Sequence, residues 1–157
     1  MNLRFRLVSL PYDPFARLFD GSDEHLATIN ARRVIADSDR GFPCRVGLRD
    51  ARVGDELLLL PWVHQAVDSP YHASGPIYVA RNSAQRVLDV GEVPPAVLSR
   101  LISLRAYDRG HMMVHAEVCE GTDVARAIGA VFANEHVDYL HLHHARQGCY
   151  SCRVVRA

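Results

Sequence analysis

Alternating apolar and polar residues predict strands along most of the chain. Residues 3–10 alternate with a period of two, as in a strand that has one wetter face. Further strands are predicted at 31–35, 44–48, 56–62, 77–81, 103–107 and 112–119. Because these strands follow one another in hairpins rather than alternating with helices, we expect an α+β fold with a mixed, mainly antiparallel sheet.

Two segments carry helical signals instead. In residues 123–133 the apolar positions recur at the spacing of an amphipathic helix, and they are Val124, Ile128, Val131 and Phe132. Thr122 or Asp123 can cap this helix. A shorter helix is predicted at 94–100, where two prolines suit a first helical turn.

The last predicted hairpin pairs residues 137–144 with 149–155 through a turn at 145–148. Side chains alternate along a strand, so His141 and His143 share one face with Val137 and Tyr139. Leu140 and Leu142 then point to the other face, which we expect to be the core.

Length and charge limit the classes of function. The chain has 157 residues with 48% hydrophobic content, which predicts a single domain over residues 1–157. Eighteen basic residues balance eighteen acidic ones, which argues against a nucleic-acid partner. No apolar run approaches the ~20 residues that span a bilayer, and no targeting segment is visible. We therefore expect no membrane association and a cytoplasmic location, where thiols stay reduced.

The hairpin is the leading candidate for a metal site. Imidazole and thiolate are ligands that zinc accepts in tetrahedral sites. If Ala145 pairs with Gly148, His141 lies opposite Cys152, and His141, His143 and Cys152 form one cluster. A register shift of one residue brings Cys149 onto that face instead. His115, on the neighbouring strand, is a candidate for the remaining position.

Other interpretations of the same residues stay open. Cys149 and Cys152 have the C-x-x-C spacing of thiol–disulfide enzymes, although the predicted strand lacks the helix N-terminus that activates such a thiol. Cys149 opposite His144 supplies a nucleophile and a base. Equally, histidines on a strand face are often solvated, and cysteines near a strand are often small core residues.

A second candidate site is the polar segment 64–75, predicted to be a long loop. Long loops between strands often carry binding residues. Three aromatic and three polar side chains in or beside this loop are candidate ligand-binding residues: Trp62, Tyr71, Tyr78, Asp68, His72 and Arg81. The alternative is a proline-stiffened connector whose aromatic side chains simply pack on the sheet.

Several short phrases, taken together and in order, resemble a known family. They are Phe42-Pro-Cys-Arg45, Leu57-Leu-Leu-Leu-Pro61, Ser69-Pro-Tyr71, Gly75-Pro-Ile-Tyr78, Ser103-Leu-Arg-Ala-Tyr-Asp108 and Gly148-Cys-Tyr-Ser-Cys-Arg153. The chain resembles the bacterial domain-of-unknown-function family 1203, from Arg4 to the C-terminus. The resemblance implies a bacterial origin and a free-standing domain, and it implies no activity.

Three functional hypotheses follow from the sequence. The first is a small-molecule- or metal-binding protein without turnover, whose site is the His141/His143 face with Cys149 or Cys152. The second is a small metal- or thiol-dependent enzyme that uses the same face. The third is an interaction module that docks a protein partner through exposed arginine and histidine side chains.

Overall fold

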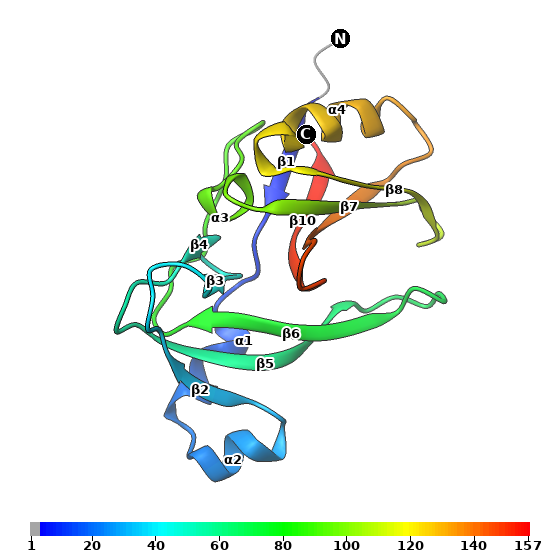
Figure 1. Ribbon diagram of the computed structural model, residues 1–157. Coiled ribbons are helices and arrows are strands. Elements are labelled where there is room, and N and C mark those ends of the chain that lie inside the picture. The colour runs from blue at the N-terminus through cyan, green and yellow to red at the C-terminus, as the bar shows by residue number, and fades with distance from the viewer. Residues whose placement is uncertain (1–3) are drawn as a thin grey trace.

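The computed structural model describes residues 4–157 and contains two five-stranded sheets (Figure 1). The first sheet is antiparallel throughout. Its strands, in spatial order, are β1 (Phe5–Val8), β10 (Tyr150–Arg156), β9 (Tyr139–His144), β7 (Leu101–Tyr107) and β8 (Met113–Glu120). The C-terminal hairpin thus lies at the centre of a sheet, where neighbouring strands restrict its exposure.

The second sheet contains one parallel pair. Its order is β2 (Arg32–Ile35), β5 (Glu56–Gln65), β6 (Ala73–Ala80), β3 (Pro43–Cys44) and β4 (Arg49–Asp50), and β3 runs parallel to β6. All other pairs are antiparallel. The predicted α+β class with mixed, mainly antiparallel pairing is therefore confirmed. The division of the strands between two sheets was not predicted.

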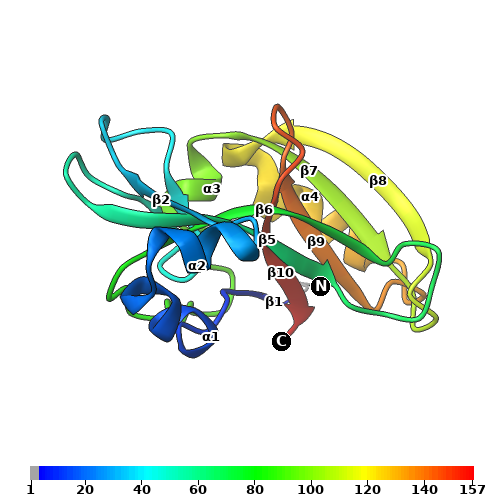
Figure 2. The same ribbon diagram turned by 90° about the horizontal axis from the view of Figure 1, so that it is seen from below.

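Helices cover the outer faces of the two sheets (Figures 1 and 2). Helix α4 (Val124–Phe132) packs on the first sheet, and its apolar stripe joins Leu104, Leu140 and Leu142 in one buried core. Helix α1 (Asp13–Ala16), the 3-10 turn η1 (Arg17–Asp20) and α2 (Asp23–Thr28) pack on the second sheet. No helix within residues 4–157 is long and apolar enough to cross a membrane.

The two predicted helices are present with shifted ends. Helix α4 follows a 3-10 turn, η2 (Gly121–Asp123), and the side chain of Asp123 accepts no capping hydrogen bond. Asp123 thus occupies the predicted N-cap position, but the capping hydrogen bond from its side chain is absent. Helix α3 spans only Pro95–Leu98 within the predicted 94–100 segment.

Three predicted segments need correction. Within 44–48 only Cys44 belongs to a strand, since residues 45–48 form a turn. Strands β5 and β6 extend into the predicted 64–75 loop and leave only residues 66–72 between them. The predicted strand 112–119 is observed as β8, Met113–Glu120, an edge strand on which Val114 and Val118 are 45% and 59% exposed. Leu3, the start of the first predicted strand, lies outside the described residues.

The inner faces of the sheets meet through polar and aromatic side chains. The Gln65 amide donates to the Tyr139 hydroxyl over 2.9 Å. His64 of β5 stacks on Tyr150 of β10, with ring centroids 5.2 Å apart. The outer cores are apolar, so this middle layer is where the fold buries its polar chemistry.

Candidate functional site

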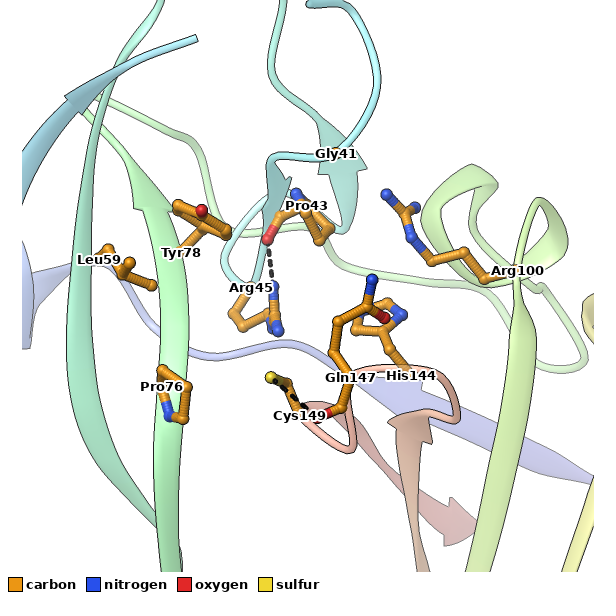
Figure 3. A pocket seen from close by; sticks show the side chains of 10 residues that line it. All are labelled: Gly41, Pro43, Arg45, Leu59, Pro76, Tyr78, Arg100, His144, Gln147 and Cys149. Atoms are coloured by element: carbon orange, nitrogen blue, oxygen red, sulfur yellow. Dashed lines mark hydrogen bonds between the residues drawn. The ribbon is translucent and has the colours of Figure 1, made fainter.

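A cavity of about 270 Å³ opens between the two sheets, and we call it the Arg45 pocket (Figure 3). One wall comes from β6 and the β3 region, and the opposite wall comes from the turn between β9 and β10. The lining residues are Gly41, Pro43, Arg45, Leu59, Pro76, Tyr78, Arg100, His144, Gln147 and Cys149. This volume lies near the lower end for ligand sites, which run from about 300 Å³, and it suits a small molecule.

Arg45 is a buried cation without an anion. Its side chain is only 2% exposed, and no carboxylate within residues 4–157 forms a salt bridge with it. The guanidinium Nε donates to the Tyr150 carbonyl over 2.6 Å, and Nη1 donates to the Pro43 carbonyl. Burial lowers the pKa of Arg45 to about 10, so the group stays charged at neutral pH.

The backbone fixes Arg45 at this place. Its N–H donates to the Tyr78 carbonyl over 3.0 Å, and its carbonyl accepts from Leu10 N over 3.1 Å. Residue 45 begins the turn that follows β3, so its side chain leaves the second sheet and reaches the first. The guanidinium in this way links two segments that lie 105 positions apart in sequence.

Arg100, the second cation of the pocket, has a partner. Its guanidinium forms two bonds with the Asp50 carboxylate, of 2.6 and 3.1 Å. Its carbonyl accepts from the N–H of Gly121 over 2.8 Å. A Cβ on Gly121 would lie 2.7 Å from the Leu98 carbonyl oxygen and 2.8 Å from that of Arg100, so only glycine permits this approach. The uncompensated charge of the pocket therefore belongs to Arg45.

His144 adds a neutral imidazole to the pocket. The residue is 3% exposed, and neither ring nitrogen has a hydrogen-bond partner within residues 4–157. Burial, and then the charges of Arg45 and Arg100, lower the pKa of His144 to about 3. A neutral imidazole offers one N–H donor and one acceptor, so the pocket holds unused hydrogen-bonding capacity.

The hairpin register separates the two cysteines. As predicted for one register, His144 lies opposite Cys149, where the His144 N–H donates to the Cys149 carbonyl over 2.8 Å. A bulge between Tyr150 and Cys152 then shifts the pairing, so that Cys152 lies opposite Leu142. The expected pairing of Cys152 with His141 is wrong, because the bulge moves Cys152 to the other face.

The thiols consequently differ in environment. Cys152 is fully buried in the core beneath α4, and burial raises its pKa to about 12. Cys149 is half-buried and lines the Arg45 pocket (Figure 3). All four cysteines are free thiols, and the two of the C-x-x-C segment do not face each other.

His141 and His143 do share a face, as predicted, and the second sheet covers it. Together with His64 and Tyr150 they form what we call the histidine–tyrosine cluster. Ring centroids lie 6.4 Å apart for His141 and His143, and 5.1 Å apart for His64 and His143. His141 and His143 are 2% and 1% exposed, and burial lowers their pKa values to about 3 and about 4. The alternative of solvated histidines is therefore wrong for this pair.

The surroundings of the cluster do not resemble a metal centre. No group of three or more His, Cys, Asp or Glu side chains within residues 4–157 is arranged to hold a metal ion. His141 lies between Arg105 and Arg153 in the cross-strand register, and both charges oppose a cation. His115 pairs with Ala106, whose other neighbour is Leu140, so it lies on the opposite face of the sheet.

The candidate ligand residues around segment 64–75 do not converge. Only Tyr78 reaches the Arg45 pocket. Trp62 packs on Phe15 beneath the second sheet, and Arg81 forms salt bridges with Asp20 and Glu56. The remaining three residues stay in the short loop: Asp68 is exposed, His72 contacts the Val67 carbonyl and Tyr71 packs against Tyr107.

Sequence reasoning missed Arg45, Arg100 and Gln147 as pocket residues. Arginine is the chain's only basic residue type apart from histidine, so no single arginine stands out. The one signal is positional, since Arg45 ends the phrase Phe42-Pro-Cys-Arg45. A charged residue directly after a strand-like segment is an ordinary turn feature, and only the fold reveals its burial.

Comparisons with known proteins identify a family without an assigned role. A family model described as a protein of unknown function (DUF1203) matches residues 41–156. No curated protein and no solved structure gives a significant match. The matched range starts after β2 and contains the residues that line the Arg45 pocket. Since the match covers most of the chain, the protein belongs to the DUF1203 family.

Proposed function

We propose that the protein binds a small anionic molecule, a carboxylate or a phosphate, in the Arg45 pocket. The observation that carries this proposal is the buried Arg45 guanidinium, which lines a cavity and has no carboxylate partner within residues 4–157. A buried charge without a counter-charge is unfavourable, and a bound anion would offset that cost. Guanidinium suits this role because its fork of donors matches carboxylate and phosphate oxygens.

The other lining residues support an anion rather than a cation. The imidazole of His144 is neutral and offers an N–H donor, and the Gln147 side chain brings an amide to the rim (Figure 3). No carboxylate of the described residues lines the cavity. Tyr78, Leu59 and Pro76 supply an apolar wall against which the carbon part of a small molecule can pack.

A thermal-shift titration at low ionic strength tests the proposal. Matched pairs such as acetate with acetamide and succinate with succinamide, together with phosphate and sulfate, separate charge from shape. We expect the anions to raise Tm and their neutral analogues to leave it unchanged. Arg45→Gln should weaken anion binding by about tenfold or more, the value of a charge-assisted hydrogen bond.

Arg146→Gln is the matched control, since it removes an exposed arginine from the turn beside Cys149 without altering the pocket lining. Should Arg45→Gln fold poorly, His144→Gln provides a second variant with the guanidinium in place. Equal stabilisation by anions and neutral analogues would overturn the proposal. So would equal anion binding by wild type and Arg45→Gln.

Zinc binding by His141 and His143 stays a prediction of the sequence. The geometry of residues 4–157 does not favour it over anion binding in the Arg45 pocket. Elemental analysis of untagged protein purified without chelator tests it directly. A stoichiometric metal lost in His141→Ala and His143→Ala would establish that site beside the pocket.

A further inference from the structure

We propose that Cys149 is the reacting group of the Arg45 pocket, a thiol that bonds covalently to the electrophilic carbon of a small carboxylate. This inference rests on the proposed function, because it needs Arg45 to hold the carboxylate. It goes further in assigning a chemical step to one atom, the Cys149 sulfur. The expected substrate class is a short carboxylate whose reactive carbon lies next to the acid group.

The first support is the position of the thiol. Cys149 is half-buried and lines the pocket, and in Figure 3 its sulfur lies below the Arg45 guanidinium. Within residues 4–157 the thiol makes only a weak contact, of 3.9 Å, with the Gln147 carbonyl. The sulfur is therefore reachable from the cavity and is not tied to a strong partner.

The second support is independent of the cysteine. His144 lies opposite Cys149 in the hairpin and lines the same cavity, with both ring nitrogens buried and without a hydrogen-bond partner among residues 4–157. A neutral ring in this place can donate its N–H to an oxygen that gains charge as the sulfur attacks. The pocket thus contains an anchor for the acid group, a nucleophile and a hydrogen-bond donor.

The other cysteines lack this combination. Cys44 and Cys152 are buried in the apolar cores on the outer sides of the sheets. Cys119 is half-buried like Cys149, but three carboxylates, those of Glu117, Asp123 and Glu120, act on it against one arginine, Arg126. An anionic electrophile is repelled there and attracted to Cys149, so Cys119 serves as an internal control.

The reaction of the Cys149 thiol with either electrophile balances in atoms and electrons, and it needs no oxidant. With a 2-oxo carboxylate, the sulfur adds to the carbonyl carbon, the π electron pair moves to the oxygen, and the thiol proton ends on that oxygen. With iodoacetate, the S–C bond forms as the C–I bond breaks, iodide leaves with the bonding pair, and the thiol proton passes to the buffer. Iodoacetate is therefore a direct probe of the site.

The test compares alkylation by iodoacetate and by neutral iodoacetamide, measured at each cysteine by peptide mass spectrometry. The ratio of the two rates, divided by that of free β-mercaptoethanol, removes intrinsic reactivity. We expect this normalised ratio to be about tenfold or more above one at Cys149, since a charged pocket concentrates an anion. At Cys119 it should be at or below one.

Variants and competition assign the effect to the pocket. Arg45→Gln should bring the Cys149 ratio to within about twofold of the free thiol, whereas Arg146→Gln should leave it high. In wild type, succinate should slow iodoacetate at Cys149 and not at Cys119, which tests the anchor even if Arg45→Gln fails to fold. A Cys149 ratio near one, or no protection by succinate, would overturn the inference.

The two proposals fail in different ways. If anions raise Tm through Arg45 but Cys149 reacts like the free thiol, the pocket binds anions without covalent chemistry. If anions also fail to raise Tm, both proposals fall. A high ratio that survives Arg45→Gln would remove Arg45 as the anchor and would overturn the inference as stated.

Discussion

Strand β9 carries histidines on both of its faces, and the two regions differ in what surrounds the rings: His141 and His143 face the second sheet, whereas His144, on the other face, lines the Arg45 pocket. Around His141 and His143 the space is filled by His64, Tyr150 and other aromatic rings. Around His144 there is a cavity with the uncompensated guanidinium of Arg45. Both regions contain buried ring nitrogens that have no hydrogen-bond partner in the described part of the chain, but only the second has room and charge for a ligand. Unsatisfied polar atoms indicate a binding site when a cavity accompanies them.

Acid should produce the largest effect, a loss in the free energy of unfolding. This loss distinguishes the closely packed histidine–tyrosine cluster from the Arg45 pocket. The pKa values of His141 and His143 are lowered to about 3 and about 4, whereas an unfolded histidine has its ordinary value of 6.5. The unfolded state therefore binds more protons below pH 6.5, and stability is complete above this pH and is lost as pH falls toward 4. Between pH 7.5 and 4.5 we expect His141 alone to cost on the order of 2 kcal/mol.

Urea unfolding at the two pH values measures this loss. His141→Leu should show a clearly smaller loss than wild type, and exposed His136→Gln should match wild type. Sulfate, charged over this whole range, should lessen the part that arises from His144 in the pocket. A loss that is equal in wild type and His141→Leu would show that the cluster does not control acid stability.

The next prediction concerns a close backbone contact beside the Arg45 pocket, one that does not involve the histidine–tyrosine cluster. Gly121→Ala places a methyl group against the carbonyl oxygens of Val97, Leu98 and Arg100. We expect a loss of about 2–3 kcal/mol in the free energy of unfolding, together with weaker anion binding as Arg100 shifts. The response to acid should keep its shape, because the cluster does not contact Gly121.

Gly129→Ala is the matched glycine control. A Cβ at Gly129 meets no atom of residues 4–157 within 4 Å, and the residue lies inside α4. Alanine there should stabilise the protein by about 0.5–1 kcal/mol through its helix propensity. Both free energies come from urea unfolding at pH 7.5. Equal effects of the two substitutions would contradict the close approach at Gly121.

The smallest expected effect concerns the charge of Arg100 in the pocket. Asp50→Asn removes the carboxylate that neutralises Arg100, which leaves two free cations beside His144. We expect anion affinity to rise about three- to tenfold at low salt, with the gain declining as ionic strength increases. Thermal-shift titration with succinate measures it, and exposed Asp37→Asn is the control. An unchanged anion affinity would show that the charge of Arg100 does not contribute to binding.

Local patterns predicted much of the fold and part of the site. The stripe of Val124, Ile128, Val131 and Phe132 specified α4, because helical periodicity is set by nearby residues. Alternation likewise assigned His141 and His143 to one face and Leu140 and Leu142 to the other, as the structure has them. The predicted position of Cys152 is wrong because of a single bulge between Tyr150 and Cys152, since one extra residue reverses every later side chain.

The sequence by itself determined most of the strands, the main helix, the α+β class and the face that each hairpin residue occupies before the bulge. Tertiary structure alone decided that a second sheet covers the histidine face and that Arg45 lies buried without a counter-charge. The physical reason is the range of the interactions. Periodicity depends on residues that are close together in the sequence. The Arg45 pocket depends instead on contacts such as that from Arg45 to Tyr150, across 105 positions.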